Sequence, residues 1–233
     1  MGKMNRKITL WTLGVISILT ISAVSVLADP INLQANTTAT FGAGSSGAVV
    51  NGSGCTAPCI TATNASGTST ITYSAAAPQI NVTLNPGEIS NVTLGVLTST
   101  STATAALGSG PSFSGATIQL TVTFTVPGGL SPQTFSGVLT GTVISTASGS
   151  IVQWTSPTTL TFNSPTAGTI TLTIESFTPI SAPSNPNPNR IRATISVTGP
   201  VIPEPSTLFL LGGGLFGLAA ATRKMMRRGK ARS

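Results

Sequence analysis

The sequence predicts an all-β protein, an antiparallel β-sandwich, on three observations made in residues 29–199. Apolar and polar side chains alternate with a period of two in many short segments, which is typical of strands with one buried face. Combinations of Asn, Pro and Gly that favour turns separate these segments. No long segment has the apolar spacing of a helix, and only 6% of the chain is charged, against about 25% in an average soluble domain. Many short strands, apolar on one face and rich in Thr on the other, favour two packed antiparallel sheets.

The alternation is clearest in residues 116–126, where Ile118, Leu120 and Val122 alternate with polar residues, mostly threonines. Residues 168–177 repeat the pattern. Weaker predicted strands cover residues 31–41, 68–74, 79–84, 89–97, 135–144, 151–154, 158–162 and 190–197. Residues 179–189 are predicted to be a loop, because their prolines cannot donate to a central strand. A right-handed parallel β-helix is the main alternative, but no fixed-length repeat requires one.

The first 28 residues have the pattern of a secretory signal peptide, a helix that flanks the β domain in the precursor. Basic residues occur at positions 3, 6 and 7, and an apolar run covers residues 8–26. Signal peptidase is expected to cleave between Ala28 and Asp29 after export by the secretion machinery. An uncleaved N-terminal anchor is the alternative, because the apolar run is on the long side.

Residues 200–233 contain three unlike elements in a fixed order. Pro203, Glu204 and Pro205 come first, an apolar run over residues 208–222 follows, and six basic side chains lie within residues 223–232. The run predicts a transmembrane helix of about 22 Å, which is short against the ~30 Å hydrocarbon core. The basic cluster favours a cytoplasmic end. An ordinary single-pass anchor is the alternative.

This tail resembles the PEP-CTERM sorting signal of bacterial surface proteins, through its Pro-Glu-Pro motif, short helix and Arg-rich end. The resemblance implies recognition and cleavage by a membrane-embedded exosortase, with Pro203, Glu204 and Pro205 as substrate residues. It also implies an exported protein whose precursor is anchored in the inner membrane with its body in the periplasm. The processed protein is then expected at the cell surface or outside the cell. The body also resembles the choice-of-anchor β domains, through residues 93–95 and 118–124, which implies a fold and no reaction.

The formal charge of +7 lies in the two ends of the chain. Between residues 29 and 205, four acidic residues oppose two arginines, which gives a net charge of −2. The body therefore has no basic patch for phosphate groups, and no nucleic-acid partner is expected.

Cys55 and Cys59 are the two cysteines of the chain. In an oxidising compartment they are predicted to form a disulfide that closes a small loop. Free thiols, or a redox or metal site, are the alternatives. Zinc prefers four ligands, and the chain has no histidine.

The sequence offers no catalytic, cofactor-binding or metal-binding residues, and a non-enzymatic role is expected. General acid–base chemistry needs His or paired carboxylates, and the body has only Asp29, Glu88 and Glu175. The expected role is structural or adhesive, in exopolysaccharide or biofilm. The alternative is a carbohydrate-binding module that uses Trp154 or another exposed aromatic. Trp154 and Tyr73 are the aromatics considered for stacking on sugar rings, although an isolated aromatic in a β domain usually belongs to the core. A hydrolase that pairs Glu88 with Glu175 is the third hypothesis.

Overall fold

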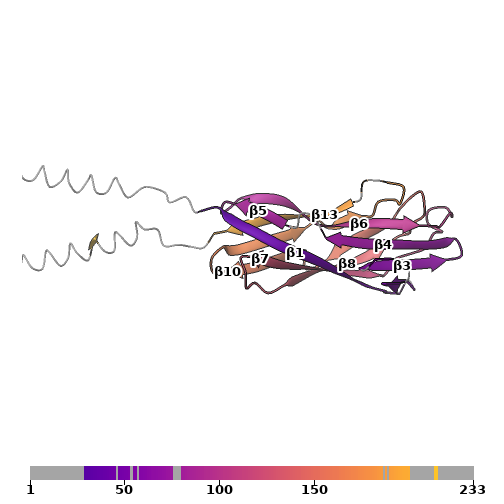
Figure 1. Cartoon of the computed structure of the whole chain (residues 1–233), viewed down its shortest axis with the longest axis horizontal. Helices are drawn as coiled ribbons and strands as arrows, with labels where there is room; N and C mark the ends of the chain where they lie inside the picture. Colours follow the sequence, from indigo (N-terminus) through magenta and orange to yellow (C-terminus); the bar gives the residue numbers. More distant parts are fainter. Residues whose placement is uncertain are drawn as a thin grey trace, which may run out of the picture. The chain divides into compact units, whose positions relative to one another are not determined.

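The computed structural model describes residues 29–45, 47–52, 55–56, 58–75, 80–185, 187, 189–199 and 213–214. Within the compact unit Asp29–Pro200, the described strands form two antiparallel sheets packed face to face (Figure 1). The predicted all-β sandwich is confirmed. The predicted signal helix, sorting motif, transmembrane helix and basic tail lie outside the described residues, apart from two helical residues, Gly213 and Gly214. Among the described residues, no helix has the length and apolar character needed to cross a membrane.

The first sheet, called sheet A, has six strands, and each pairs antiparallel with its neighbours. Their order across the sheet is β12 (Phe177–Pro179), β9 (Ile151–Thr155), β8 (Gln133–Thr140), β7 (Thr117–Val126), β1 (Ile31–Gly42) and β5 (Ile80–Leu84).

The second sheet, called sheet B, has seven strands and is also antiparallel throughout. Their order is β10 (Thr159–Ser164), β11 (Gly168–Ile174), β13 (Asn189–Thr198), β6 (Ile89–Ser101), β4 (Gly67–Ala75), β3 (Cys59–Asn64) and β2 (Val49–Val50).

The core lies between the sheets because alternate side chains of nearly every strand point inward. In β7 the buried residues are Ile118, Leu120, Val122 and Phe124, as the alternation predicts. Phe124 of sheet A meets Phe162 of sheet B edge to face, with ring centroids 4.8 Å apart. Each large apolar side chain buried in this way contributes about 1.5–3 kcal/mol to folding.

Besides the predicted strand 135–144, which ends in β8 at Thr140, three details of the sequence prediction are wrong. The segment 168–177 is two strands, because β11 ends at Ile174 in sheet B and the chain then enters β12 in sheet A. The loop predicted at residues 179–189 is one residue too long at each end, since Pro179 belongs to β12 and Asn189 to β13. The third error is that β2 and β3 were not predicted, although Ile60 and Ala62 of β3 are buried.

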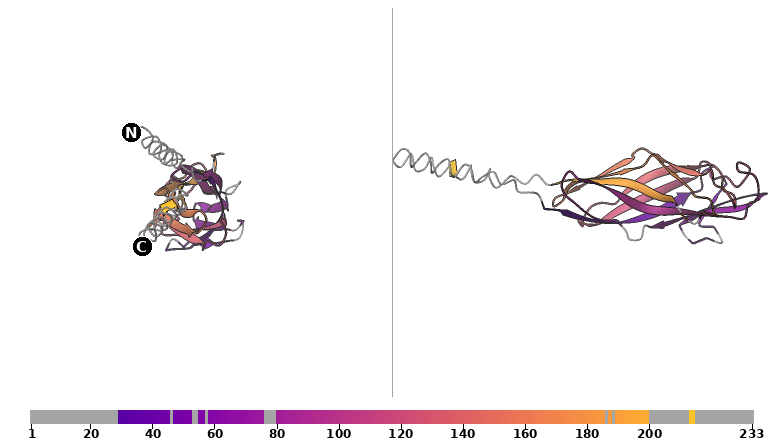
Figure 2. Two further views of the ribbon diagram at one scale, coloured as in Figure 1. Left: turned by 90° about the vertical axis from the view of Figure 1, so that its left-hand side faces the viewer. Right: turned by 90° about the horizontal axis from the view of Figure 1, so that it is seen from above.

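The chain enters and leaves the body at one end, called the exit end (Figures 1 and 2). Ile31 of the first strand pairs with Leu84, just before the turn 85–88. Gly87 N in that turn donates to Val197 O at 2.8 Å, and Gly199 packs against Pro86. The start of β1 and the end of β13 therefore lie beside the same turn.

Candidate functional site

The turn at the exit end is closed by Glu88. Its Oε2 accepts hydrogen bonds from Asn85 N at 2.9 Å and from Asn85 Nδ2 at 3.1 Å. Glu88 N in turn donates to Asn85 O at 2.9 Å, and Gly87 has a positive φ of 87°, which glycine adopts at little cost. The Glu88 carboxylate thus holds the turn against which the last strand of the body packs.

The residues predicted for processing are close in sequence to the two ends of the body. Asp29 is described and exposed, whereas Ala28, Pro203, Glu204 and Pro205 lie outside the described residues. The last described residue of the body is Gly199. The chain therefore runs from the exit end to the sorting motif in a few residues.

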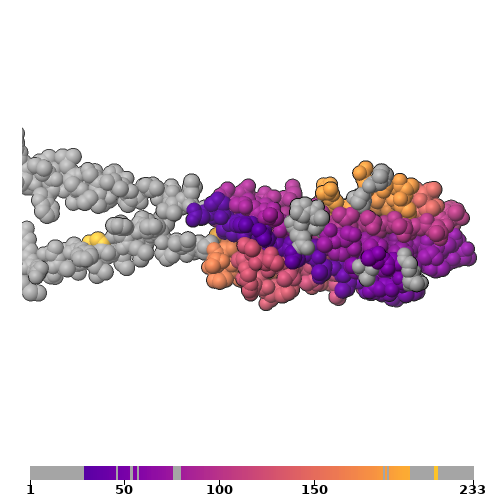
Figure 3. Space-filling model, in the orientation of Figure 1, coloured from indigo at the N-terminus to yellow at the C-terminus, as the bar shows by residue number. Residues whose placement is uncertain are grey.

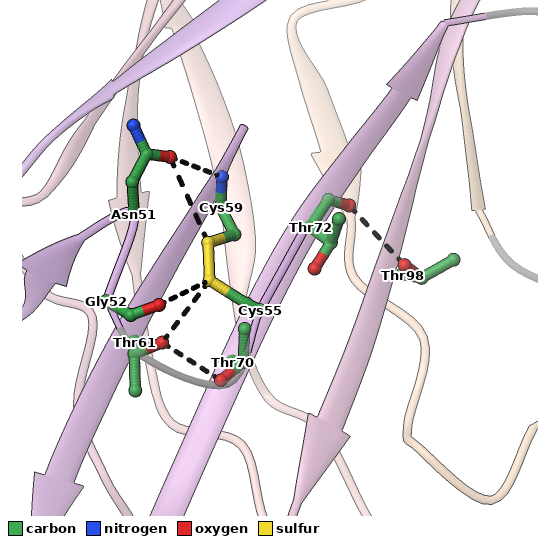
Figure 4. Close-up of a disulfide and its surroundings, with 8 residues drawn as sticks. All are labelled: Asn51, Gly52, Cys55, Cys59, Thr61, Thr70, Thr72 and Thr98. Atoms are coloured by element: carbon green, nitrogen blue, oxygen red, sulfur yellow. Dashed lines mark hydrogen bonds between the residues drawn. A yellow bond between two sulfur atoms is a disulfide. The ribbon is translucent and has the colours of Figure 1, made fainter. Parts of the chain in front are cut away.

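Cys55 and Cys59 form the predicted disulfide (Figure 4). Asn51 supports it, because its N donates to Cys59 O at 2.9 Å and its Oδ1 accepts from Cys59 N at 3.1 Å. The disulfide closes a loop of five residues between β2 and β3, at the margin of sheet B. Both sulfurs are used in this bond, so the structure contains the predicted disulfide and not the free thiols of the alternative.

The other end of the body, called the far end, carries loops that brace one another. The far-end loops are the turn 64–67 and the segments 102–116 and 141–150. β6 connects the two ends with 13 residues, which is about 40 Å at ~3.3 Å per residue. The loops contain no charged side chain, and Leu107 at their surface is 49% exposed.

Hydrogen bonds hold the two long far-end loops together. Ser145 N donates to Ala103 O at 2.9 Å, and Phe113 N donates to Gly141 O at 3.0 Å. Asn64 Nδ2 adds a bond to Ser109 O at 3.0 Å. Loops of about 15 residues without strands or helices are uncommon in compact domains and are often functional. An ordered, uncharged loop surface at the far end is therefore the best candidate site on the described body.

The aromatic residues considered for sugar stacking are both buried. Trp154 and Tyr73 are each 4% exposed. The indole Nε1 of Trp154 donates to Thr178 Oγ1 at 3.0 Å, and burial raises the pKa of the Tyr73 phenol. The hypothesis of a carbohydrate site built on either ring is wrong, because the period-two alternation of β9 and β4 turns both rings inward.

The paired-carboxylate hypothesis is also wrong for Glu88 and Glu175. Glu175 N donates to Arg192 O, and the turn of Glu88 bonds to Val197 O. These two positions on β13 are five residues apart, or about 17 Å along a strand, whereas glycosidase carboxyl groups lie about 5–10 Å apart. Glu175 is exposed, as predicted, because it continues the set of alternate positions that the outward-facing threonines occupy.

The described surface in the space-filling view is continuous, without a deep hollow between strands (Figure 3). No curated protein and no solved structure matches the chain. The resemblance of the body to choice-of-anchor domains therefore stays a prediction. Residues 201–224 do match the family model of the PEP-CTERM protein-sorting motif. The chain thus carries the sorting signal of an exported protein that exosortase processes and that is destined for the cell surface.

Proposed function

We propose that the body is a non-enzymatic adhesive or structural module that binds neutral extracellular polysaccharide through its far-end loops. The observation that carries this proposal is the arrangement of the chain ends. Both the start of β1 and the end of β13 lie at the exit end, so a protein held by its tail leaves the far end free. The precursor is held in the inner membrane by the segment 208–222 until exosortase acts.

The chemistry of the far-end loops supports an uncharged partner. Their exposed groups are hydroxyls, amides and backbone atoms from Ser, Thr, Asn and Gly, together with the apolar side chains of Leu107, Ala65 and Ala106. Hydroxyl and amide groups exchange hydrogen bonds with sugar hydroxyls, and an apolar side chain packs against the C–H face of a sugar ring. Loop bracing lowers the entropy cost of ordering these groups when a ligand binds.

The test is a pull-down of the exported protein on exopolysaccharide from the producing cells. We expect wild-type protein to be retained and Leu107→Glu to reduce the affinity about fivefold or more, because it buries a charge at the contact. Ile89→Glu is the matched control, since Ile89 is also an exposed apolar residue, 69% exposed, but begins β6 at the exit end.

Ile89→Glu is expected to bind like wild type. Equal loss in both variants would contradict binding by the far end, and absence of retention of wild-type protein would contradict the polysaccharide role. Both variants are compared by thermal unfolding, so that a folding defect is not read as lost binding.

A further inference from the structure

Sheet A ends in a strand whose outer edge no described strand pairs with. β5 pairs with β1 over five residues and lies last in the order of the sheet. In sheet B, the last described pair of β4 with β6 is Ala75 opposite Gly95. The strand lies at the margin of the body next to the start of β1, and its atoms reach the surface there (Figures 1 and 3).

The other three sheet margins are short or covered. At the margin formed by β10, the side chain of Gln133 donates from Nε2 to Thr161 O at 2.6 Å, so part of that edge is covered. At the other end of sheet A, β12 has three residues and ends in Pro179, and β2 of sheet B has two residues. Unpaired edges attract other strands, and short length, proline and coverage are the usual protections. By contrast, β5 contains no proline and no charge, and no described strand pairs with its outer edge.

The sequence of β5 is complementary to itself. It reads Ile80, Asn81, Val82, Thr83, Leu84, so the order of apolar and polar residues is symmetric about Val82. Ile80 and Leu84 are buried, Val82 packs partly buried against the core, and the two polar side chains are exposed. Antiparallel pairing centred on Val82 sets Ile80 opposite Leu84 and Asn81 opposite Thr83, so that apolar residues share the inner face.

We propose that β5 pairs antiparallel with β5 of a second copy of this chain, about a two-fold axis at Val82. Such a contact is isologous, because each residue pair occurs twice, and it makes one continuous sheet of the two copies of sheet A. None of the six strands of sheet A contains a charged residue, so no like-charge repulsion between these strands opposes the approach.

This pairing sets the direction of the two bodies. β5 ends at Leu84, which pairs with the first residue of β1 at the exit end. Antiparallel pairing there makes the two bodies point in opposite directions, with both exit ends near the junction and both sets of far-end loops outermost. The dimer presents two equivalent loop surfaces. The inference does not depend on what those loops bind.

The test measures self-association of the exported protein, purified from cells that express the full chain, by analytical ultracentrifugation. A five-residue edge is small against a typical stable interface. Wild type is therefore expected to form a weak dimer whose fraction rises with protein concentration. Asn81→Lys with Thr83→Lys sets like charges directly opposite each other, and we expect about a tenfold or greater loss of association. Thr159→Lys with Thr161→Lys on β10 is the matched control and is expected to behave as wild type.

Two further variants keep the test decisive. Mixing the Asn81→Lys, Thr83→Lys protein with an Asn81→Glu, Thr83→Glu protein is expected to restore a heterodimer. Val82→Cys is expected to give a disulfide-linked dimer on mild oxidation, and Thr161→Cys is expected to give none. Wild-type protein that stays monomeric at its highest soluble concentration would overturn the proposal. So would lysine variants that associate as wild type does, or the failure of Val82→Cys to cross-link.

Discussion

Replacing the Tyr73 hydroxyl tests how the two sheets are joined. This hydroxyl, on β4, lies 2.8 Å from Thr37 Oγ1 of β1 and 2.9 Å from Leu94 O of β6. Leu94 lies at a β-bulge, because the register of β6 with β13 skips from Gly95 to Thr93. A bulged residue is left out of the ladder, and the tyrosine hydroxyl lies within hydrogen-bonding distance of the Leu94 carbonyl.

Tyr73→Phe leaves the hydroxyl of Thr37 and the carbonyl of Leu94 without these bonds, and both residues are buried. A buried polar group without a partner costs about 1–3 kcal/mol. We therefore expect a loss of about 2 kcal/mol in the free energy of unfolding, or roughly 5 °C in Tm for a domain of this size. The assay is urea unfolding followed by fluorescence of Trp154, the one tryptophan in residues 29–199.

Thr37→Val is the control for this experiment. It removes one partner and keeps the bond to the carbonyl, so we expect a loss of about 1 kcal/mol. Because the two residues share a bond, the double variant is expected to lose less than the sum of the single variants. If Tyr73→Phe lowers the free energy of unfolding by less than about 0.5 kcal/mol, the tyrosine hydroxyl is not an important hydrogen-bond partner of the Leu94 carbonyl.

The remaining predictions concern alkaline pH, the close approach at Gly95, and the disulfide. Burial raises the pKa of the Tyr73 phenol, so the unfolded chain releases this proton first, near pH 10. Stability is then constant below about pH 10 and falls as pH rises towards the folded pKa. The free energy of unfolding, measured at increasing pH, should fall in this way for wild type and should not for Tyr73→Phe. Residues 29–199 contain no lysine, so no lysine titration overlaps with that of the tyrosine. Gly95→Ala places a methyl group against the tyrosine ring and should cost about 1–3 kcal/mol by the same assay, and an unchanged midpoint would count against that contact. Replacing Cys55 and Cys59 by serine should cost about 2 kcal/mol or less, because the closed loop is short, and a protein that failed to fold would show that the disulfide holds the whole domain.

The strands that the sequence predicts well are those whose local pattern matches their final environment. β7 and β13 alternate apolar and polar residues without interruption, and the structure buries the apolar residues of each apart from Val126 at the end of β7. Local pattern does not determine sheet membership, however. The change of sheet after Ile174 depends on packing between distant strands, and nothing in the alternation of residues 168–177 marks it.

The functional residues likewise include some that the sequence alone identifies and some that need the fold. The sorting motif is a linear signal, so Pro203, Glu204 and Pro205 can be identified from the sequence alone. The far-end loops become a site only because the fold brings residues 102–116 and 141–150 together, and their Ser- and Gly-rich sequence resembles any connecting segment. The burial of Trp154 likewise depends on which face of β9 meets the other sheet.

Processing of both chain ends is tested by the intact mass of the mature protein exported by cells that carry exosortase. We expect a mass without residues 1–28 and without the basic cluster 223–232, because signal peptidase and exosortase are expected to remove the two ends of the precursor. Substituting Glu204 by Ala should leave the tail uncleaved. Wild-type exported protein that retains the full sequence to Ser233 would contradict processing at the sorting motif.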